Sequence, residues 1–298
     1  MWVFPKFRKS FSGSTNIVPG FLLIALLTVI PACSRRNKTG QEKYITIKGS
    51  DTMVHLVTNW ADAFMKKNPD IEISVTGGGS GTGIAALING TTDICASSRE
   101  ITENEKKLAQ KQGVIPAETA VALDGIAIVV NPANPVTELS MAQLKSVFTG
   151  NITQWNQVGG PDQQILLLSR ESSSGTFLFF QEYILEKQDY AHNAKLMPAT
   201  SAIIQSVSSD KWAIGYIGLG YAVSAAEDIK ILAIKTKDNA AVVKPSEETV
   251  KSGKYPIARP LLVYTKSNGT NTLKKFIEFC LSSEGQQIVK TSGYITVK

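Results

Sequence analysis

Histidine and cysteine are scarce in this sequence. The chain has 298 residues but only two His, at positions 55 and 192, and three Cys. No group of His, Cys and acidic residues has the spacing of metal ligands, so we expect neither a zinc nor an iron site, and no other cofactor. Cys95 and Cys280 each lie inside an apolar segment, which favours two buried free thiols over a disulfide.

The sequence also has only a small excess of one sign of charge. Lys and Arg number 31 against 25 Asp and Glu, but the first 32 residues hold three of these cations and no acid. From Cys33 onward, 28 basic residues therefore face 25 acidic ones, and no dense basic block is present. We expect no nucleic-acid partner, because such proteins concentrate their positive charge on one surface.

The sequence has no long hydrophobic run that could span a bilayer. Its clearest apolar stretch, residues 20–30, has only 11 residues, whereas a membrane-spanning helix needs about 20. Three cations precede this stretch within residues 1–15. A basic segment followed by a short apolar one is typical of a secretory signal peptide, which we place at residues 1–32.

The signal peptide ends in Ile30-Pro31-Ala32-Cys33, which resembles the lipobox of bacterial lipoproteins. The resemblance implies that Cys33 receives a lipid and becomes the mature N-terminus, with the membrane as a partner through this anchor. An ordinary signal peptide with a Cys at this place by chance is the alternative. Residues 33–43 are polar and are expected to form a flexible tether.

The mature chain alternates between strand-like and helix-like segments, which predicts an α/β fold. Hydrophobic residues make up 43% of the chain, enough for a large core in one or two domains. Residues 123–131 are nearly all apolar, as expected of a strand covered on both faces. Further strands are expected at 44–48, 71–75, 93–96, 165–169, 212–218, 231–234 and 261–265, and helices at 54–66, 83–88, 139–148, 177–185, 272–281 and 285–290.

Three predicted strands run into short segments of Gly, Ser and Thr that open helices, at residues 49–53, 77–83 and 172–176. The N-terminus of a helix presents free backbone N–H groups, and hydroxyl side chains add donors. Ligands in open α/β sheets lie beyond the carboxyl ends of the strands. Three such helix starts therefore predict a site for a small anion, although each taken alone is equally consistent with a capped helix.

Arg170 follows the predicted strand 165–169 and stands four residues before Ser174. Its guanidinium is expected to lean over the same helix start and to make a bidentate contact with an oxyanion. A surface Arg at a strand end is the alternative. Catalysis is disfavoured, because the sequence has no GxSxG turn, no P-loop and only the isolated His55 as a base near the hydroxyl groups.

The order of these motifs along the chain, from about residue 44 to 298, resembles the phosphate-binding proteins of bacterial ABC transporters, the PstS type. The resemblance rests on the three segments above together with Ala96-Ser97-Ser98-Arg99-Glu100, Val147-Phe148-Thr149-Gly150, Trp155, Gly159-Gly160, Ile214-Gly215-Tyr216 and Ser283-Glu284-Gly285-Gln286.

This resemblance implies a two-lobed periplasmic-binding-protein-like fold of type II, in which each lobe is a mixed sheet flanked by helices. Lobe I is expected at 44–124 and 259–298, and lobe II at 125–258. Inorganic phosphate is expected between the lobes. The resemblance assigns its binding to Thr52, Met53, Ser80, Ser98, Arg170, Ser174, Gly175 and Thr176.

One position departs from the family. Where many relatives carry an Asp that accepts the proton of hydrogen phosphate, this sequence has Ser98. Such an Asp rejects sulfate, which has no proton to donate. Asp51 or Glu171 is an alternative acceptor, although either can equally serve a helix end or a neighbouring cation. Arg99 either adds a second positive group to the site or pairs with Glu100 or Glu103.

The resemblance implies a monomeric, non-enzymatic receptor, anchored outside the cytoplasmic membrane, that delivers phosphate to an ABC permease. Three alternatives stay open: a receptor for another tetrahedral oxyanion such as sulfate or molybdate, a secreted hydrolase or phosphatase that uses Ser80 or Ser174, and an adhesion or signalling lipoprotein.

Overall fold

The computed structural model describes residues 43–237 and 240–297, which belong to one compact unit within residues 38–298. The predicted signal peptide, the lipidation site Cys33 and the tether up to residue 42 lie outside the described residues. No described helix is both long and apolar enough to cross a membrane.

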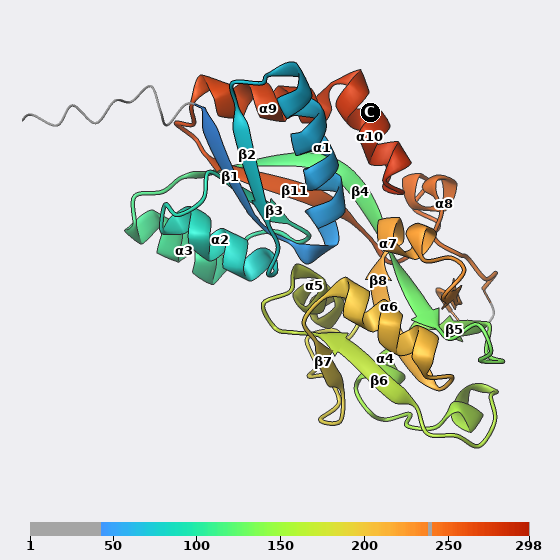
Figure 1. Cartoon of the computed structure of the whole chain (residues 1–298). Helices are drawn as coiled ribbons and strands as arrows, with labels where there is room; N and C mark the ends of the chain where they lie inside the picture. The colour runs from blue at the N-terminus through green and yellow to red at the C-terminus, as the bar shows by residue number, and fades with distance from the viewer. Residues whose placement is uncertain (1–42, 238–239, 298) are drawn as a thin grey trace, which may run out of the picture. The chain divides into compact units, whose positions relative to one another are not determined.

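A nine-stranded sheet runs through this unit in the order β2-β1-β3-β11-β4-β8-β6-β7, with β9 paired to β4 (Figure 1). Its strands are β1 Tyr44–Gly49, β2 Glu72–Thr76, β3 Ile94–Ser97, β4 Pro116–Val130, β6 Leu166–Arg170, β7 Lys195–Met197, β8 Ala213–Gly218, β9 Lys230–Ile231 and β11 Ala258–Lys266. A small parallel pair, β5 Glu138–Ser140 and β10 Ala233–Lys235, lies beside it.

One strand, β4, runs through both halves of this sheet. β4 pairs with β11 from Pro116 to Gly125 and with β8 from Ile126 to Val130. The hydrophobic core divides at the same place, because Val121 and Ala122 pack in one set of clusters and Ile126 onward in another. The structure is therefore the predicted two-lobed α/β fold, and we call the half with β1 the first lobe and the half with β8 the second lobe.

The first lobe is covered on both faces of its sheet. Ile45 and Ile47 of β1 pack with helices α1 Val54–Lys67, α9 Asn271–Leu281 and α10 Ser283–Thr291. On the opposite face, Cys95 packs with α2 Ser80–Ile88 and α3 Glu103–Lys111. Cys95 and Cys280 are free and buried, as predicted, and burial raises the pKa of the Cys95 thiol to about 12.

The second lobe repeats this arrangement. Residues 126–130 of β4 are all buried, with alternate side chains packing on opposite faces, so the prediction of a strand covered on both sides is confirmed. Helices α4 Met141–Phe148 and α5 Gly175–Tyr183 contribute to the core on one face, and α6 Thr200–Ser209 and α7 Leu219–Ser224 to the core on the other. The short helix α8 Glu247–Lys251 and the 3-10 turns Asp51–Met53 and Trp155–Val158 complete the described elements.

The expected strands are found, with ends that differ by a few residues. The strand expected at 123–131 is part of the longer β4, and the segment 231–234 is split between β9 and β10. Three helices begin two or three residues earlier than predicted, α2 at Ser80, α5 at Gly175 and α10 at Ser283. In α2 and α5, Gly, Ser and Thr residues form the first helical turn. Helices α3, α6, α7 and α8 and strands β5 and β7 were not predicted.

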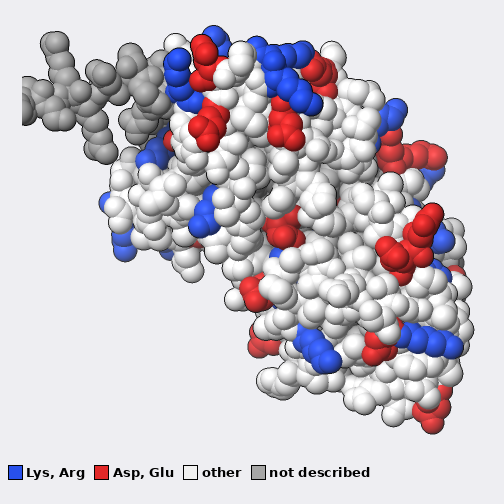
Figure 2. Space-filling view, viewed as in Figure 1, with Lys and Arg blue, Asp and Glu red and all other residues white. Residues whose placement is uncertain are grey.

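Charge is mixed over the surface. On the face shown in Figure 2, Lys and Arg lie among Asp and Glu, and no large area of the described surface carries a single sign. A protein that binds the phosphate backbone of a nucleic acid needs a continuous basic surface. This face offers none.

Candidate functional site

Three helix starts meet where the lobes face each other. The turn Asp51–Met53 follows β1, α2 begins at Ser80, and α5 of the second lobe begins at Gly175. The amide of Gly81 donates to the Ser173 carbonyl at 3.0 Å, so the α2 and α5 starts are in direct contact. The backbone amides of Ser80, Gly175 and Thr176 have no acceptor among the described residues. Such free amides at helix starts are suited to bind an anion.

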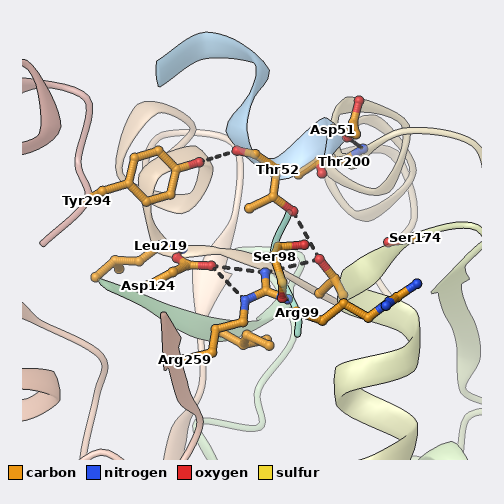
Figure 3. A network of polar contacts seen from close by, with 12 residues as sticks. Asp51, Thr52, Ser98, Arg99, Asp124, Ser174, Thr200, Leu219, Arg259 and Tyr294 are labelled. Carbon is orange, nitrogen blue, oxygen red and sulfur yellow. Dashed lines mark hydrogen bonds and ion pairs between the residues drawn. The ribbon is translucent and has the colours of Figure 1, made fainter. Parts of the chain in front are cut away.

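Hydroxyl groups from separate segments gather at the same place (Figure 3). The Oγ1 atoms of Thr52 and Thr176 are 2.9 Å apart and join the two lobes. The Oγ atoms of Ser80 and Ser98 are 3.3 Å apart, and the Ser98 amide donates to Ser80 Oγ at 3.0 Å. All four side chains are buried. The structure thus brings together four of the predicted binding residues.

Gly175 allows this close approach. A Cβ built at position 175 would overlap Ser80 Oγ and lie 2.7 Å from Ser98 Oγ, so no larger residue fits while the lobes are in contact. The absence of a side chain lets the hydroxyl groups of the first lobe face the helix start of the second lobe directly.

A buried ion pair lies beside these hydroxyl groups. Arg259 Nη2 donates to Asp124 Oδ2 at 3.0 Å and to Thr176 Oγ1 at 3.0 Å, and Arg259 Nη1 donates to the Ser98 carbonyl at 2.9 Å. The side chains are 1% and 0% exposed. Burial raises the pKa of Asp124 and lowers that of Arg259, because each charge has lost its water, while their mutual attraction opposes both shifts.

Arg170 is buried at the predicted place, but its donors are largely used by the protein. It donates to the carbonyls of Met197 and Pro198, to Thr200 Oγ1 and to Asp51 Oδ2. These bonds take four of the five N–H groups of a guanidinium. The expected bidentate contact with an oxyanion is therefore not available in this conformation. Arg170 instead holds Asp51 of the first lobe against the second lobe.

Two other predicted residues lie at the site with their own partners. The Met53 amide donates to the Ser50 carbonyl at 3.1 Å, and its side chain is buried in the first-lobe core. Ser174 is the N-cap of α5, where its hydroxyl accepts the amide of Phe177 at 3.4 Å. In this conformation the Met53 amide is not free to bind an anion.

The alternatives for Arg99 and for the acidic acceptor are narrowed by the structure. Arg99 forms two hydrogen bonds with Glu105, at 2.7 and 2.8 Å, rather than with Glu100 or Glu103 carboxylates. Its Nε is buried without a partner among the described residues.

The two candidates for the acidic acceptor differ in their surroundings. Glu171 is exposed, whereas Asp51 Oδ2 already accepts hydrogen bonds from Arg170 and from the Thr200 amide.

Sequence reasoning missed Asp124 and Arg259 as site residues and treated their positions only as lobe crossings. A usable signal was present, since Asp124 is the only charged residue in the apolar stretch 119–130, and Arg259 directly precedes the apolar residues 260–263. A buried charge needs a partner, and these two strands are neighbours in the sheet.

The groups that meet at the site are mainly hydrogen-bond donors. His55 packs edge-on against Tyr221 rather than beside a Ser of the cluster. Within residues 43–237 and 240–297, no group of three or more His, Cys, Asp or Glu side chains could hold a metal ion. The site presents N–H and O–H donors, which suit the acceptor oxygens of a small anion.

Comparison with known proteins agrees with this geometry. The chain matches the PBP superfamily domain over residues 36–284. It is 32% identical to the phosphate-binding protein PstS of Pseudomonas aeruginosa, over 97% of this chain and 95% of that protein. It is also 32% identical to the PstS of Bacillus subtilis, over 95% and 94% of the two chains.

Solved structures show the same likeness. A phosphate ABC transporter substrate-binding protein from Clostridium perfringens, described as putative and solved with bound phosphate, superposes with a TM-score of 0.78 at 32% identity. It covers 86% of this chain, and this chain covers all of it. An ABC-type phosphate transport receptor from Vibrio cholerae gives 0.69 at 31% identity, over 85% of this chain and 99% of that one.

The fold and the site thus define a substrate-binding protein of the PBP superfamily. Within that superfamily, the chain belongs to the PstS family of phosphate-binding proteins. The relatives described above are named as binding proteins and transport receptors, not as enzymes.

Proposed function

We propose that this protein binds inorganic phosphate as the receptor of a phosphate ABC transporter. The observation that carries this proposal is the meeting of three helix starts from two lobes, with free amides and buried hydroxyl groups directed at one place. Family membership supports the same ligand, since the relatives are named for phosphate.

In this proposal the phosphate oxygens accept hydrogen bonds from both lobes. Thr52, Ser80 and Ser98 act from the first lobe, and Gly175 and Thr176 from the second lobe, where Ser174 orders the helix start. Met53 and Arg170 belong to the site as residues that shape it, because their donors are bonded to the protein in this conformation. Arg259 supplies the positive charge that reaches the hydroxyl cluster.

We place the lobe boundaries at the sequence positions predicted above, 44–124 with 259–298 and 125–258. The change of β4 from pairing with β11 to pairing with β8 at Gly125 and Ile126 supports this division. A ligand that contacts both lobes stabilises the state in which they are together, because those contacts exist only there. A permease can recognise the closed state.

The anchor and the delivery step are part of the same proposal. A receptor held at the outer side of the cytoplasmic membrane through lipid on Cys33 stays close to the permease that it serves. Labelling of the expressed protein with a radioactive fatty acid, and its loss on Cys33→Ala, tests the anchor. Label that persists in this variant would contradict it.

Calorimetric titration of the purified protein under anion-free conditions tests the ligand. We expect heat of binding with phosphate, and Thr176→Val is expected to weaken the affinity at least tenfold, about 1.4 kcal/mol, because a hydroxyl shared by both lobes is lost. Thr137→Val, at an exposed position, is the matched control and should bind as the wild type does. If phosphate produces no heat of binding, the proposal that this protein binds phosphate is wrong.

A further inference from the structure

Three hydroxyl groups inside the second lobe, which the proposed binding set does not use, are hydrogen-bonded in one chain. The Tyr216 hydroxyl lies 2.8 Å from Ser169 Oγ and 2.9 Å from the Tyr190 hydroxyl, which in turn donates to the Phe177 carbonyl at 2.9 Å. Ser169 and Tyr216 are fully buried and Tyr190 is half-buried. Burying polar groups is costly unless they are bonded, and apolar side chains would avoid this cost. The position of this hydroxyl chain therefore calls for an explanation.

The bonds of the hydroxyl chain run in one direction, because each hydroxyl group has a single proton. Tyr190 donates its proton to the Phe177 carbonyl, so it accepts from Tyr216. The proton of Tyr216 is then used, and Ser169 must donate to it. The amide of Arg170 also donates to the Tyr216 oxygen, at 3.3 Å. Burial raises the pKa of both tyrosine hydroxyl groups, so both keep their protons.

The hydroxyl chain connects the two segments through which the second lobe reaches the site. Arg170 ends β6, and Phe177 lies in the first turn of α5. Only the turn of residues 171–174 joins these segments along the backbone. Arg170 binds Asp51 of the first lobe, and the start of α5 presents the free amides. A change in the distance between the two segments would therefore move one set of donors relative to the other.

We propose that Ser169, Tyr216 and Tyr190 are positioning residues, which hold the start of α5 in a fixed place relative to Arg170. This inference rests on the proposed function. All three residues belong to the second lobe, so the hydroxyl chain orders its half of the site before the lobes close. Donors that are already in place lose less freedom when the ligand binds, and bonds in such a chain strengthen one another.

The variants Tyr216→Phe and Tyr190→Phe test the inference, since each removes one hydroxyl group and keeps the ring. We expect each to weaken phosphate affinity about tenfold in calorimetric titration. Tyr255→Phe is the matched control, because Tyr255 is buried in the same lobe and its hydroxyl donates to the Ile126 carbonyl, outside the hydroxyl chain. It should lower the melting temperature about as much as Tyr190→Phe does, and yet bind phosphate as the wild type does. Equal affinity losses in Tyr255→Phe and Tyr190→Phe would overturn the inference.

The double variant separates a connected chain from independent contributions to the fold. If Tyr190 and Tyr216 act through one chain, Tyr190→Phe combined with Tyr216→Phe should bind phosphate about as weakly as Tyr216→Phe alone. Independent effects would multiply to a loss of about 100-fold, which contradicts the inference. If Tyr216→Phe does not fold, Tyr190→Phe and its control still decide.

The failure of this inference differs from the failure of the proposed function. A wild-type protein that binds phosphate, together with Phe variants that bind it equally well, overturns the positioning role alone. A wild type that binds no phosphate overturns the proposed function and this inference with it.

Discussion

Gly175 lies where the two lobes are in close contact. A methyl group there would collide with the hydroxyl groups of Ser80 and Ser98, which belong to the other lobe. Because the collision is between lobes and not within one, it is relieved when the lobes separate. A substitution at this position should thus affect the closed state and spare the folding of each lobe.

We predict that Gly175→Ala lowers phosphate affinity at least tenfold and leaves the melting temperature of the ligand-free protein within about 3 °C of the wild type, a change of about 1 kcal/mol or less. Calorimetry and thermal unfolding measure the two effects. Ser172→Ala, in the exposed part of the same loop, serves as control. A large drop in melting temperature would show that Gly175 is required for the fold itself.

At the residue scale, the sequence predicted the Gly, Ser and Thr groups but not the ion pair. Short segments such as residues 77–83 carry their signal locally, because composition alone indicates a helix start. Asp124 and Arg259 are 135 positions apart, and their pairing depends on β11 inserting next to β4. A single sequence gives no register between distant strands, so the charge that completes the site could not be placed.

At the scale of elements, α3 shows how a polar helix is held in place. Thr102 and Glu105 form a capping box, and Glu105 also binds the buried Arg99. The pKa of Glu105 lies below its usual value: burial raises it, but hydrogen bonds from Arg99 and Thr102 lower it more. A lowered pKa means that the folded protein is stabilised by the ionised form, and that this contribution is lost as the pH falls through the folded-state pKa.

Glu105→Gln should accordingly lower the free energy of unfolding by about 1–2 kcal/mol at pH 7. The difference should shrink progressively as the pH falls below about 4.3, the ordinary pKa of Glu in the unfolded state, and through the lower folded-state pKa of Glu105. Urea unfolding at both pH values measures it. Glu103→Gln removes only an exposed pair with Lys106 and should change stability by less than about 0.5 kcal/mol. A pH-independent effect of Glu105→Gln would contradict the assignment.

The elements that the sequence revealed are those with apolar periodicity. Strand β1 buries alternate residues, and helices α1 and α9 bury apolar residues at helical spacing. Helix α3 was missed because it buries only Ala109, although its capping box at Thr102 and Glu105 was readable. Helix α6 buries only Thr200, Ile203 and Val207 within a serine-rich segment, which left the helical pattern weak.

At the scale of the whole described unit, Asp51 links the two lobes through hydrogen bonds. Its Oδ2 atom accepts from Arg170 Nη1 at 3.1 Å and from the amide of Thr200 at 2.8 Å, both in the second lobe. Charge-assisted bonds of this kind are stronger than neutral ones, and they exist only when the lobes are together. They should therefore govern how long a ligand stays enclosed.

We predict that Asp51→Ala accelerates phosphate release at least tenfold, with a smaller effect on the association rate, since contacts made after encounter act mainly on dissociation. Stopped-flow measurement of ligand displacement tests this. The exposed Asp62→Ala, on α1, is the control. An unchanged release rate would mean that Asp51 does not contribute to closure.

The position of β11 has a consequence for how the chain acquires its structure during synthesis. β11 lies between β3 and β4, yet more than 120 residues, including most of the second lobe, separate it from the end of β4. A nascent chain that stops before Ala258 has made every strand of the first lobe except the one in its middle. Until that strand emerges from the ribosome, β3 and β4 expose backbone edges of the kind that promote aggregation, and the second lobe must fold beside an unfinished partner.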